Sequence, residues 1–192
     1  VMVGRMIGEK AIASVGTTYS LNFLILGFIQ GTCVGFGIPL AKAVGAQNSV
    51  EFRRYFWNGT WLCILFSLLM TVLSTAFSGT LLRLMGTPEE IFSEARTYIR
   101  IIFFGIPATI LYNFCAGALR ASGDSRRPTA FLLFSSLLNI VLDYLLIGPA
   151  QMGVAGAALA TVLSQLISGL LNLFWIVRRT ELLRQSEGCR EF

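Results

Sequence analysis

The chain has 192 residues, of which 55% are hydrophobic and only 13% charged, and its mean hydropathy is +0.71. A charge density of about half the usual value leaves too little polar surface to cover a water-soluble protein. The sequence therefore indicates an integral membrane protein. It contains no His, and its four Cys have no CxxC spacing, which argues against a zinc site, a Ser-His-Asp triad and a disulfide framework.

Five stretches are long and apolar enough to cross a hydrocarbon core of roughly 30 Å, which takes about 20 helical residues. In chain order they cover residues 17–41, 55–82, 92–119, 129–147 and 153–177. The third is entered through Glu94, Arg96 and Arg100, so its lipid-buried part is expected to begin near Tyr98. The predicted fold is an all-α, polytopic bundle of five transmembrane helices, with a basic tail over residues 178–192.

Turn-forming residues separate these stretches. They are Gly45–Asn48, Gly86–Pro88, Gly123–Pro128 and Gly148–Gln151. At the second turn, Thr87 is expected to cap the following helix with its hydroxyl, and Pro88 to take the first helical position.

Lys and Arg are unevenly distributed between the two sides of this bundle. One side holds ten of the 15 positive residues, namely Lys42, Arg53, Arg54, Arg120, Arg126, Arg127, Arg178, Arg179, Arg184 and Arg190. By the positive-inside rule this side is cytoplasmic, which places Val1 outside and Phe192 inside a plasma or inner cell membrane. The net charge of +5 is thus a topology signal, and no nucleic-acid partner is expected. An outside N-terminus without a preceding helix inserts poorly, so we expect an upstream helix and interpret the chain as a fragment.

Asp143 is the only charged residue between Pro128 and Val177. A carboxylate in a transmembrane helix costs at least about 2.5–3.5 kcal/mol on insertion scales, which makes it a candidate functional residue. Residues four apart share a helix face, so Ser135, Asn139 and Asp143 are expected to form one polar stripe.

The fifth helix carries a matching stripe of Thr161, Gln165, Ser168 and Asn172. Thr161 would lie roughly 12 Å along this helix, close to the depth expected for Asn139. We therefore expect Asn139, Asp143 and Thr161 to surround one cavity. Polar residues also join membrane helices without binding anything, and that role is an equal alternative for Thr161, Gln165 and Asn172 taken singly.

Such a group of oxygens can accept a proton or hold Na⁺ at Asp143, Asn139 and Thr161. Either event neutralises the buried charge and changes which packing of the helices is most stable. This is the physical basis of cation-coupled transport, and it requires no cofactor besides Na⁺ or H⁺.

Several strings resemble those of one transporter family, the multidrug and toxic compound extrusion (MATE) family. The strings, in chain order, are VGR at residues 3–5, GTPE at 86–89 followed by Ala95 and Tyr98, GALR at 117–120, GDSRRP at 123–128, NIVLD at 139–143 and GVAGAALAT at 153–161. Together they cover almost the whole chain.

The resemblance implies a fold of twelve helices in two six-helix lobes, in which inward Na⁺ or H⁺ is exchanged for outward amphipathic, often cationic, drugs. Residues 1–177 would be part of the N-terminal lobe, with helices two to six. The implied partners are the lipid bilayer, a small organic substrate, the missing first helix and the C-terminal lobe. The resemblance gives cation-site roles to Asn139, Asp143 and Thr161, and makes Tyr98 a hydrogen-bonding neighbour.

Two alternatives stay open, a lipid-linked-oligosaccharide flippase of the same superfamily and a structural membrane subunit that transports nothing. A central cavity rich in Arg would favour a flippase, because each guanidinium group can make two parallel hydrogen bonds to the pyrophosphate of a lipid-linked sugar. An enzyme is not expected, because the chain offers one intramembrane carboxylate and no His. The sequence decides neither the exported compound nor the choice between Na⁺ and H⁺.

Overall fold

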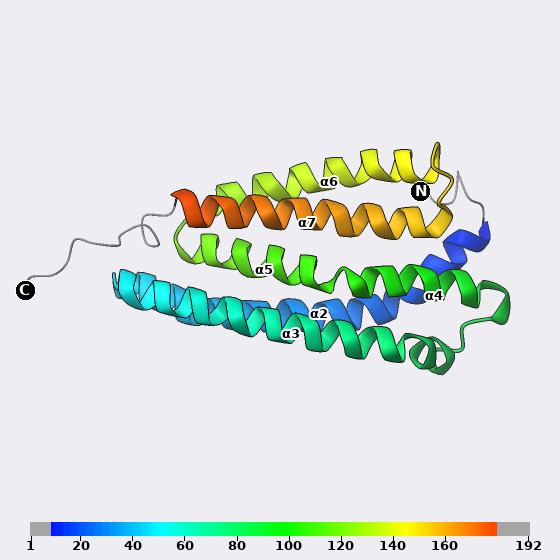
Figure 1. The fold of residues 1–192 in the computed structure, drawn as a ribbon, viewed down its shortest axis with the longest axis horizontal. Coiled ribbons are helices and arrows are strands. Elements are labelled where there is room, and N and C mark those ends of the chain that lie inside the picture. The colour runs from blue at the N-terminus through cyan, green and yellow to red at the C-terminus, as the bar shows by residue number, and fades with distance from the viewer. Residues whose placement is uncertain (1–8, 180–192) are drawn as a thin grey trace, which may run out of the picture.

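The computed structural model describes residues 9–179, and the described chain is helical and contains no strand (Figure 1). Its helices are α2 (Glu9–Gly45), α3 (Ser49–Leu84), α4 (Glu89–Phe104), α5 (Ile106–Ala121), α6 (Arg126–Ile147) and α7 (Gly153–Arg179). Four of these helices are long and apolar enough to cross a membrane, and the bent pair α4–α5 makes a fifth span. The predicted all-α membrane bundle is confirmed.

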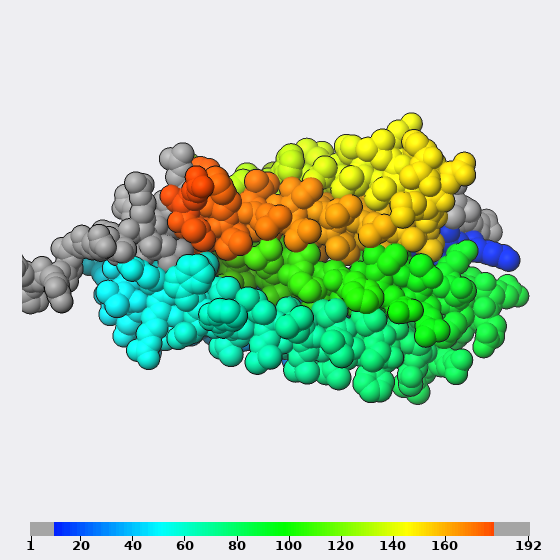
Figure 2. Space-filling view, in the orientation of Figure 1, coloured from blue at the N-terminus to red at the C-terminus, as the bar shows by residue number. Residues whose placement is uncertain are grey.

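The helices lie side by side in three tiers (Figure 1). The α4–α5 pair runs between the α2–α3 pair on one side and α6–α7 on the other. In the space-filling view, α3 and α7 flank α4 on the same face of the molecule (Figure 2). The core lies where α5 meets its neighbours, and there the Phe56 and Phe114 rings stack with their centroids 5.6 Å apart.

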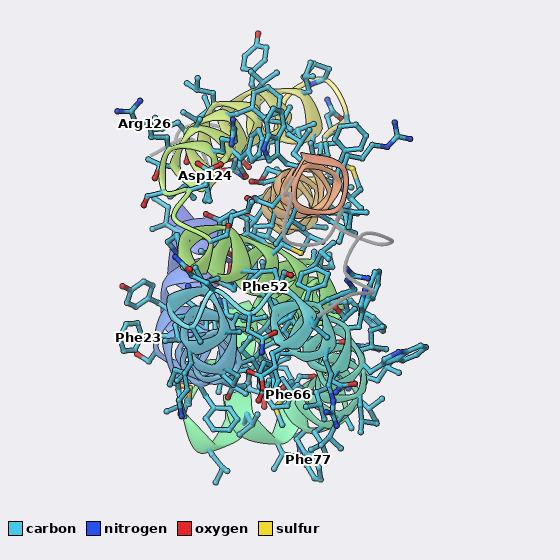
Figure 3. All side chains as sticks on the ribbon, turned by 90° about the vertical axis from the view of Figure 1, so that its left-hand side faces the viewer. Phe23, Phe52, Phe66, Phe77, Asp124 and Arg126 are labelled. Carbon is cyan, nitrogen blue, oxygen red and sulfur yellow. The ribbon has the colours of Figure 1, made fainter. Side chains whose placement is uncertain are left out.

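Large apolar side chains cover the outside of the bundle as well as its core. Phe23 and Phe77 point outward and are 73% and 55% exposed, whereas Phe52 lies inside and is fully buried (Figure 3). Helix α6 likewise exposes most of its apolar residues. A surface of this kind is stable in lipid, which solvates hydrocarbon side chains that water would not.

The predicted single helix over residues 92–119 is wrong, because a break at Gly105 divides it into α4 and α5. The two segments are bent by 42°. Pro107 follows at the start of α5, where its missing N–H removes a backbone donor. Gly105 also lies directly against α7, since a Cβ atom built on it would be 2.3 Å from Cγ2 of Val162.

The ends of the helices also differ from the predicted ones. Helices α2 and α3 are longer at both ends than the stretches 17–41 and 55–82. The predicted cap at Thr87 is wrong, because Pro88 takes the N-cap position without a side-chain hydrogen bond. A side-chain cap is found instead at α3, where Asn48 accepts a hydrogen bond of 3.0 Å from the backbone N–H of Glu51.

The connections divide between the two ends of the bundle. The α2–α3 and α5–α6 connections lie at one end, and the α3–α4 and α6–α7 connections lie at the other (Figure 1). We call the first the basic end, because the described positive residues near it are Lys42, Arg53, Arg54, Arg120, Arg126, Arg127 and Arg178. The opposite end carries Lys10, Arg83, Arg96 and Arg100. The unequal distribution of positive residues expected from the sequence is therefore present. That the basic end lies in the cytoplasm stays a prediction.

Candidate functional site

The candidate site residues of α6 lie on its polar stripe of Ser135, Asn139 and Asp143. This stripe faces α7. Ser135 is buried and donates a hydrogen bond of 2.9 Å from its hydroxyl to the backbone carbonyl of Ser164. Asn139 and Asp143 follow at intervals of one turn and are half-buried. The sequence therefore predicted this helix face correctly.

Asn139 reaches α7 directly. Its Nδ2 atom donates to Oγ1 of Thr161 over 3.5 Å, and the Thr161 hydroxyl donates to the carbonyl of Ala157 at 3.0 Å. Small residues permit this approach, since a Cβ atom on Gly156 would lie 3.0 Å from the carbonyl oxygen of Leu146. The amide and the hydroxyl predicted to share a site are in contact.

Tyr98 lies on a third helix, α4, which packs against α7 but not against α6. It is half-buried and close enough to Asp143 for the phenol and the carboxylate to interact electrostatically. Tyr98 lies on the flank of α4 that also carries Gly105, the residue packed against Val162 of α7. The structure thus places Asn139 in contact with Thr161 and Tyr98 within electrostatic range of Asp143, with no hydrogen bond between Tyr98 and Asp143 among the described residues.

The Asp143 carboxylate is incompletely satisfied. Its Oδ1 atom is buried and has no hydrogen-bond partner among the described side chains, residues 10–178. A buried acceptor without a partner is costly, and a proton or a cation would remove that cost. The described residues contain no group of three His, Cys, Asp or Glu suited to a metal ion. One carboxylate among neutral oxygens therefore suits H⁺ or Na⁺ better than a transition metal.

The residues of the predicted polar stripe on α7 make hydrogen bonds to different helices. Ser168 donates a hydrogen bond of 3.0 Å to the carbonyl of Phe131 on α6, and Gln165 accepts one of 2.5 Å from the hydroxyl of Thr109 on α5. Asn172 is fully buried and donates to the backbone of its own helix. Of the four residues, Thr161 is the one that contacts the Asn139 side chain.

Thr109 and Glu94 are among the residues with polar contacts or buried polar atoms that were not singled out from the sequence. Thr109 is the α5 partner of Gln165, and nothing in its local sequence indicates which helix it faces. Glu94 was treated only as a charge at the entry of a helix, yet its Oε2 atom is buried and has no hydrogen-bond partner in the described chain. It precedes Tyr98 by one turn on α4, which places a second carboxylate on the same flank.

A second polar cluster holds α6 and α7 together at the basic end. Arg127 forms an ion pair with Asp124, and its guanidinium carbon lies 4.3 Å from the centre of the Trp175 ring. The Asp124 carboxylate also accepts a hydrogen bond of 3.2 Å from the backbone N–H of Arg127. Arg126 is exposed and points away from the bundle (Figure 3). Arg127, in the turn predicted at Gly123–Pro128, thus links α6 to α7.

Comparison with known proteins gives a consistent result. The chain is 31% identical over 99% of its length to a probable multidrug resistance protein, YoeA of Bacillus subtilis, and 36% identical over 92% to a second one, YpnP of the same organism. It covers 42% and 40% of those two proteins, about two fifths of their length. A crystal structure of a MATE transporter in the bent conformation superposes with a TM-score of 0.88 at 28% identity, covering 98% of this chain and 43% of that one.

The family model MatE matches residues 1–145, which include α2 to α5 and most of α6. The matched range contains Tyr98, Asn139 and Asp143, and Thr161 lies beyond it. A match over well over half of the chain establishes its family. The chain belongs to the MatE family, the multidrug and toxic compound extrusion transporters.

Proposed function

We propose that this chain is part of the N-terminal lobe of an efflux transporter that exports amphipathic organic compounds, drugs and toxins among them, in exchange for Na⁺ or H⁺. The observation that carries the proposal is the Asp143 carboxylate, which has an unpartnered buried oxygen and lies one helical turn from Asn139, the residue that contacts Thr161. The names of the two Bacillus proteins support export of drugs by the whole protein.

Coupling would work through α7, which packs against both α6 and α4. With the site empty, a charged Asp143 carboxylate opposes dehydration and close packing of α6 against α7. Binding of H⁺ or Na⁺ neutralises it, so the closely packed arrangement gains relative stability. The break at Gly105 allows α4, which carries Tyr98, to change its angle without breaking the hydrogen bonds within α5.

The complete transport cycle would need more than the residues in this chain. We propose that a first helix and a C-terminal lobe complete the pathway for the organic substrate, in a plasma or inner cell membrane with the basic end in the cytoplasm. An oligosaccharide flippase is disfavoured, because the described arginines lie near the two ends of the bundle and none accompanies Asp143 in the candidate site.

Asp143→Asn tests the proposal, because it keeps the side-chain shape and removes the titratable charge. In the full-length transporter we expect a folded protein that binds its drug but no longer exports it when an ion gradient is applied to vesicles. Tyr144→Phe, at an exposed neighbour on α6, is the matched control and should export normally.

Asn139→Ala and Thr161→Ala each remove one neutral ligand. Each should weaken cation affinity by about 1 kcal/mol, roughly five-fold, as measured by the cation concentration that stabilises the protein against heat. Export by Asp143→Asn at the unmodified rate, with equal protein in the vesicles, would exclude this cation site.

A further inference from the structure

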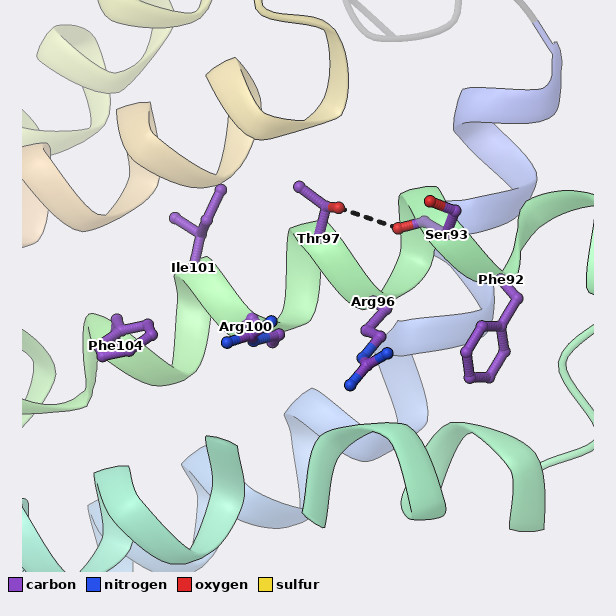
Figure 4. Close-up of a pocket in the computed structure, with 7 residues that line it drawn as sticks. All are labelled: Phe92, Ser93, Arg96, Thr97, Arg100, Ile101 and Phe104. Atoms are coloured by element: carbon purple, nitrogen blue, oxygen red, sulfur yellow. Dashed lines mark hydrogen bonds between the residues drawn. The ribbon is translucent and has the colours of Figure 1, made fainter. Parts of the chain in front are cut away.

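A cavity of about 540 Å³ lies on the side of α4 near the end opposite to the basic one (Figure 4). Its lining combines two arginines and two hydroxyl groups with three large apolar side chains. They are Phe92, Ser93, Arg96, Thr97, Arg100, Ile101 and Phe104. None of them belongs to the Asp143 site.

A second cavity, of about 220 Å³, adjoins the first and shares Phe92 and Arg96 with it. It lies between α4 and α3 and adds Arg83 to the positive side chains. Arg83 is held by Phe92, because its guanidinium carbon lies 5.7 Å from the ring centre. Arg96 extends toward α3 (Figure 4), where a Cβ atom on Gly79 would lie 3.6 Å from its Nε atom.

Among the described side chains, residues 10–178, no ion pair involves Arg83, Arg96 or Arg100. Arg96 lies roughly 10 Å and Arg100 roughly 16 Å along α4 from its first residue, at the depth of lipid headgroups and the upper acyl chains. Positive charge is also unusual on the side of a bundle that the positive-inside rule makes external. These exposed guanidinium groups are therefore available to an anion from outside the described chain.

Along α4 the cavity lining changes from polar to apolar toward the membrane interior, as a phospholipid changes from its phosphate to its acyl chains. Arg96, Thr97 and Arg100 occupy its middle, and Phe104, which is 62% exposed, lies deepest in the membrane. Guanidinium groups bind phosphate through paired hydrogen bonds, and an exposed aromatic ring next to them offers contact to an acyl chain. A small soluble anion would use the arginines and leave Ile101 and Phe104 without a partner.

We propose that the two cavities form a binding site for the phosphate of an anionic phospholipid in the leaflet at the α3–α4 end, with its acyl chain along Ile101 and Phe104. None of the residues that line the two cavities belongs to the proposed cation site. The arginines could bind the phosphate of a lipid or a free phosphate ion in the same way. Only the lipid has an acyl chain for Ile101 and Phe104 to contact.

The test places the photoreactive residue p-benzoylphenylalanine at position 92 of the full-length transporter, where the native Phe lines both cavities. The protein is reconstituted with equal amounts of phosphatidylglycerol and neutral diglucosyl diacylglycerol, illuminated, and analysed by mass spectrometry. We expect a strong preference for phosphatidylglycerol adducts. That preference should fall about five-fold in Arg96→Gln or Arg100→Gln and about 30-fold in the double variant.

The double variant Arg54→Gln with Arg126→Gln removes the same charge from exposed positions at the basic end and should keep the preference. If the double variant at Arg96 and Arg100 fails to fold, the two single variants decide the question. Excess inorganic phosphate should not reduce the adducts, and displacement by phosphate would assign the site to a free anion. Equal labelling of both lipids, an adduct with protein instead of lipid, or an unchanged preference in the Arg96 and Arg100 variants would overturn the proposal.

Discussion

Gly105→Ala should destabilise the transporter, because helix α7 occupies the space that a methyl group would need. The added Cβ atom would lie 2.3 Å from Cγ2 and 3.0 Å from Cγ1 of Val162, and also 3.0 Å from the backbone carbonyl oxygen of Ile102. Val162 is β-branched and has few rotamers in a helix, so it cannot easily move aside. The α4–α5 segment must then shift away from α7.

The expected cost is about 1–3 kcal/mol, the usual range for an extra carbon in a closely packed position. Gly117→Ala is the matched control in α5, because a Cβ atom there would have nothing within 4 Å. Since Ala favours a helix over Gly by about 1 kcal/mol, that control should be neutral or slightly stabilising. The two chemically identical substitutions should therefore differ in sign.

The assay is the free energy of unfolding of the full-length protein in detergent micelles, measured by titration with sodium dodecyl sulfate. Val162→Ala removes both clashing methyl groups, so Gly105→Ala combined with Val162→Ala should be more stable than Gly105→Ala alone. The difference from additivity measures the contact itself. Equal stability of Gly105→Ala and Gly117→Ala, or no rescue by Val162→Ala, would refute the steric explanation of the break.

Three further predictions concern topology and the contact between α6 and α7. Single Cys reporters at Asn48 and Ser125, in a background without native Cys, should be labelled from the cytoplasm, and labelling of Ser125 from outside would reverse the orientation. Ser135→Ala removes a hydrogen bond to the α7 backbone and should lower the unfolding free energy by roughly 0.6 kcal/mol, with no loss of cation affinity. Arg127→Gln should lower the thermal midpoint more than Arg126→Gln, because only Arg127 contacts Asp124 and Trp175, and equal midpoints would contradict this anchor.

The membrane class, the number of spans and the polar face of α6 could be predicted from the sequence. Each depends on properties of neighbouring residues: apolar length, the position of turn residues and the four-residue spacing of Ser135, Asn139 and Asp143. The pairing of Asn139 with Thr161 was also accessible, because a short turn makes α6 and α7 antiparallel neighbours and so matches their depths.

The break in the third span was not predicted, because its cause lies in another helix. Gly105 and Pro107 are compatible with a continuous transmembrane helix, since glycine and proline are tolerated there when neighbours satisfy the backbone. The close approach of Val162 makes the glycine necessary. The partner of Gln165 was missed for a similar reason, because the sequence of α7 does not show that Thr109 of α5 faces it.

The sequence by itself determined which residues must lie in lipid and which polar groups are too costly to leave there alone. Those properties follow from the free energy of transferring each side chain into the bilayer, which depends on the local stretch of chain. Only the tertiary structure decided which polar groups meet: Ser168 donates to the carbonyl of Phe131 on α6, Gln165 accepts from Thr109 on α5, and the buried Oε2 atom of Glu94 has no partner among the described residues. Contacts between helices depend on their rotation and tilt, which are set by packing against several neighbours at once and by no single segment of the sequence.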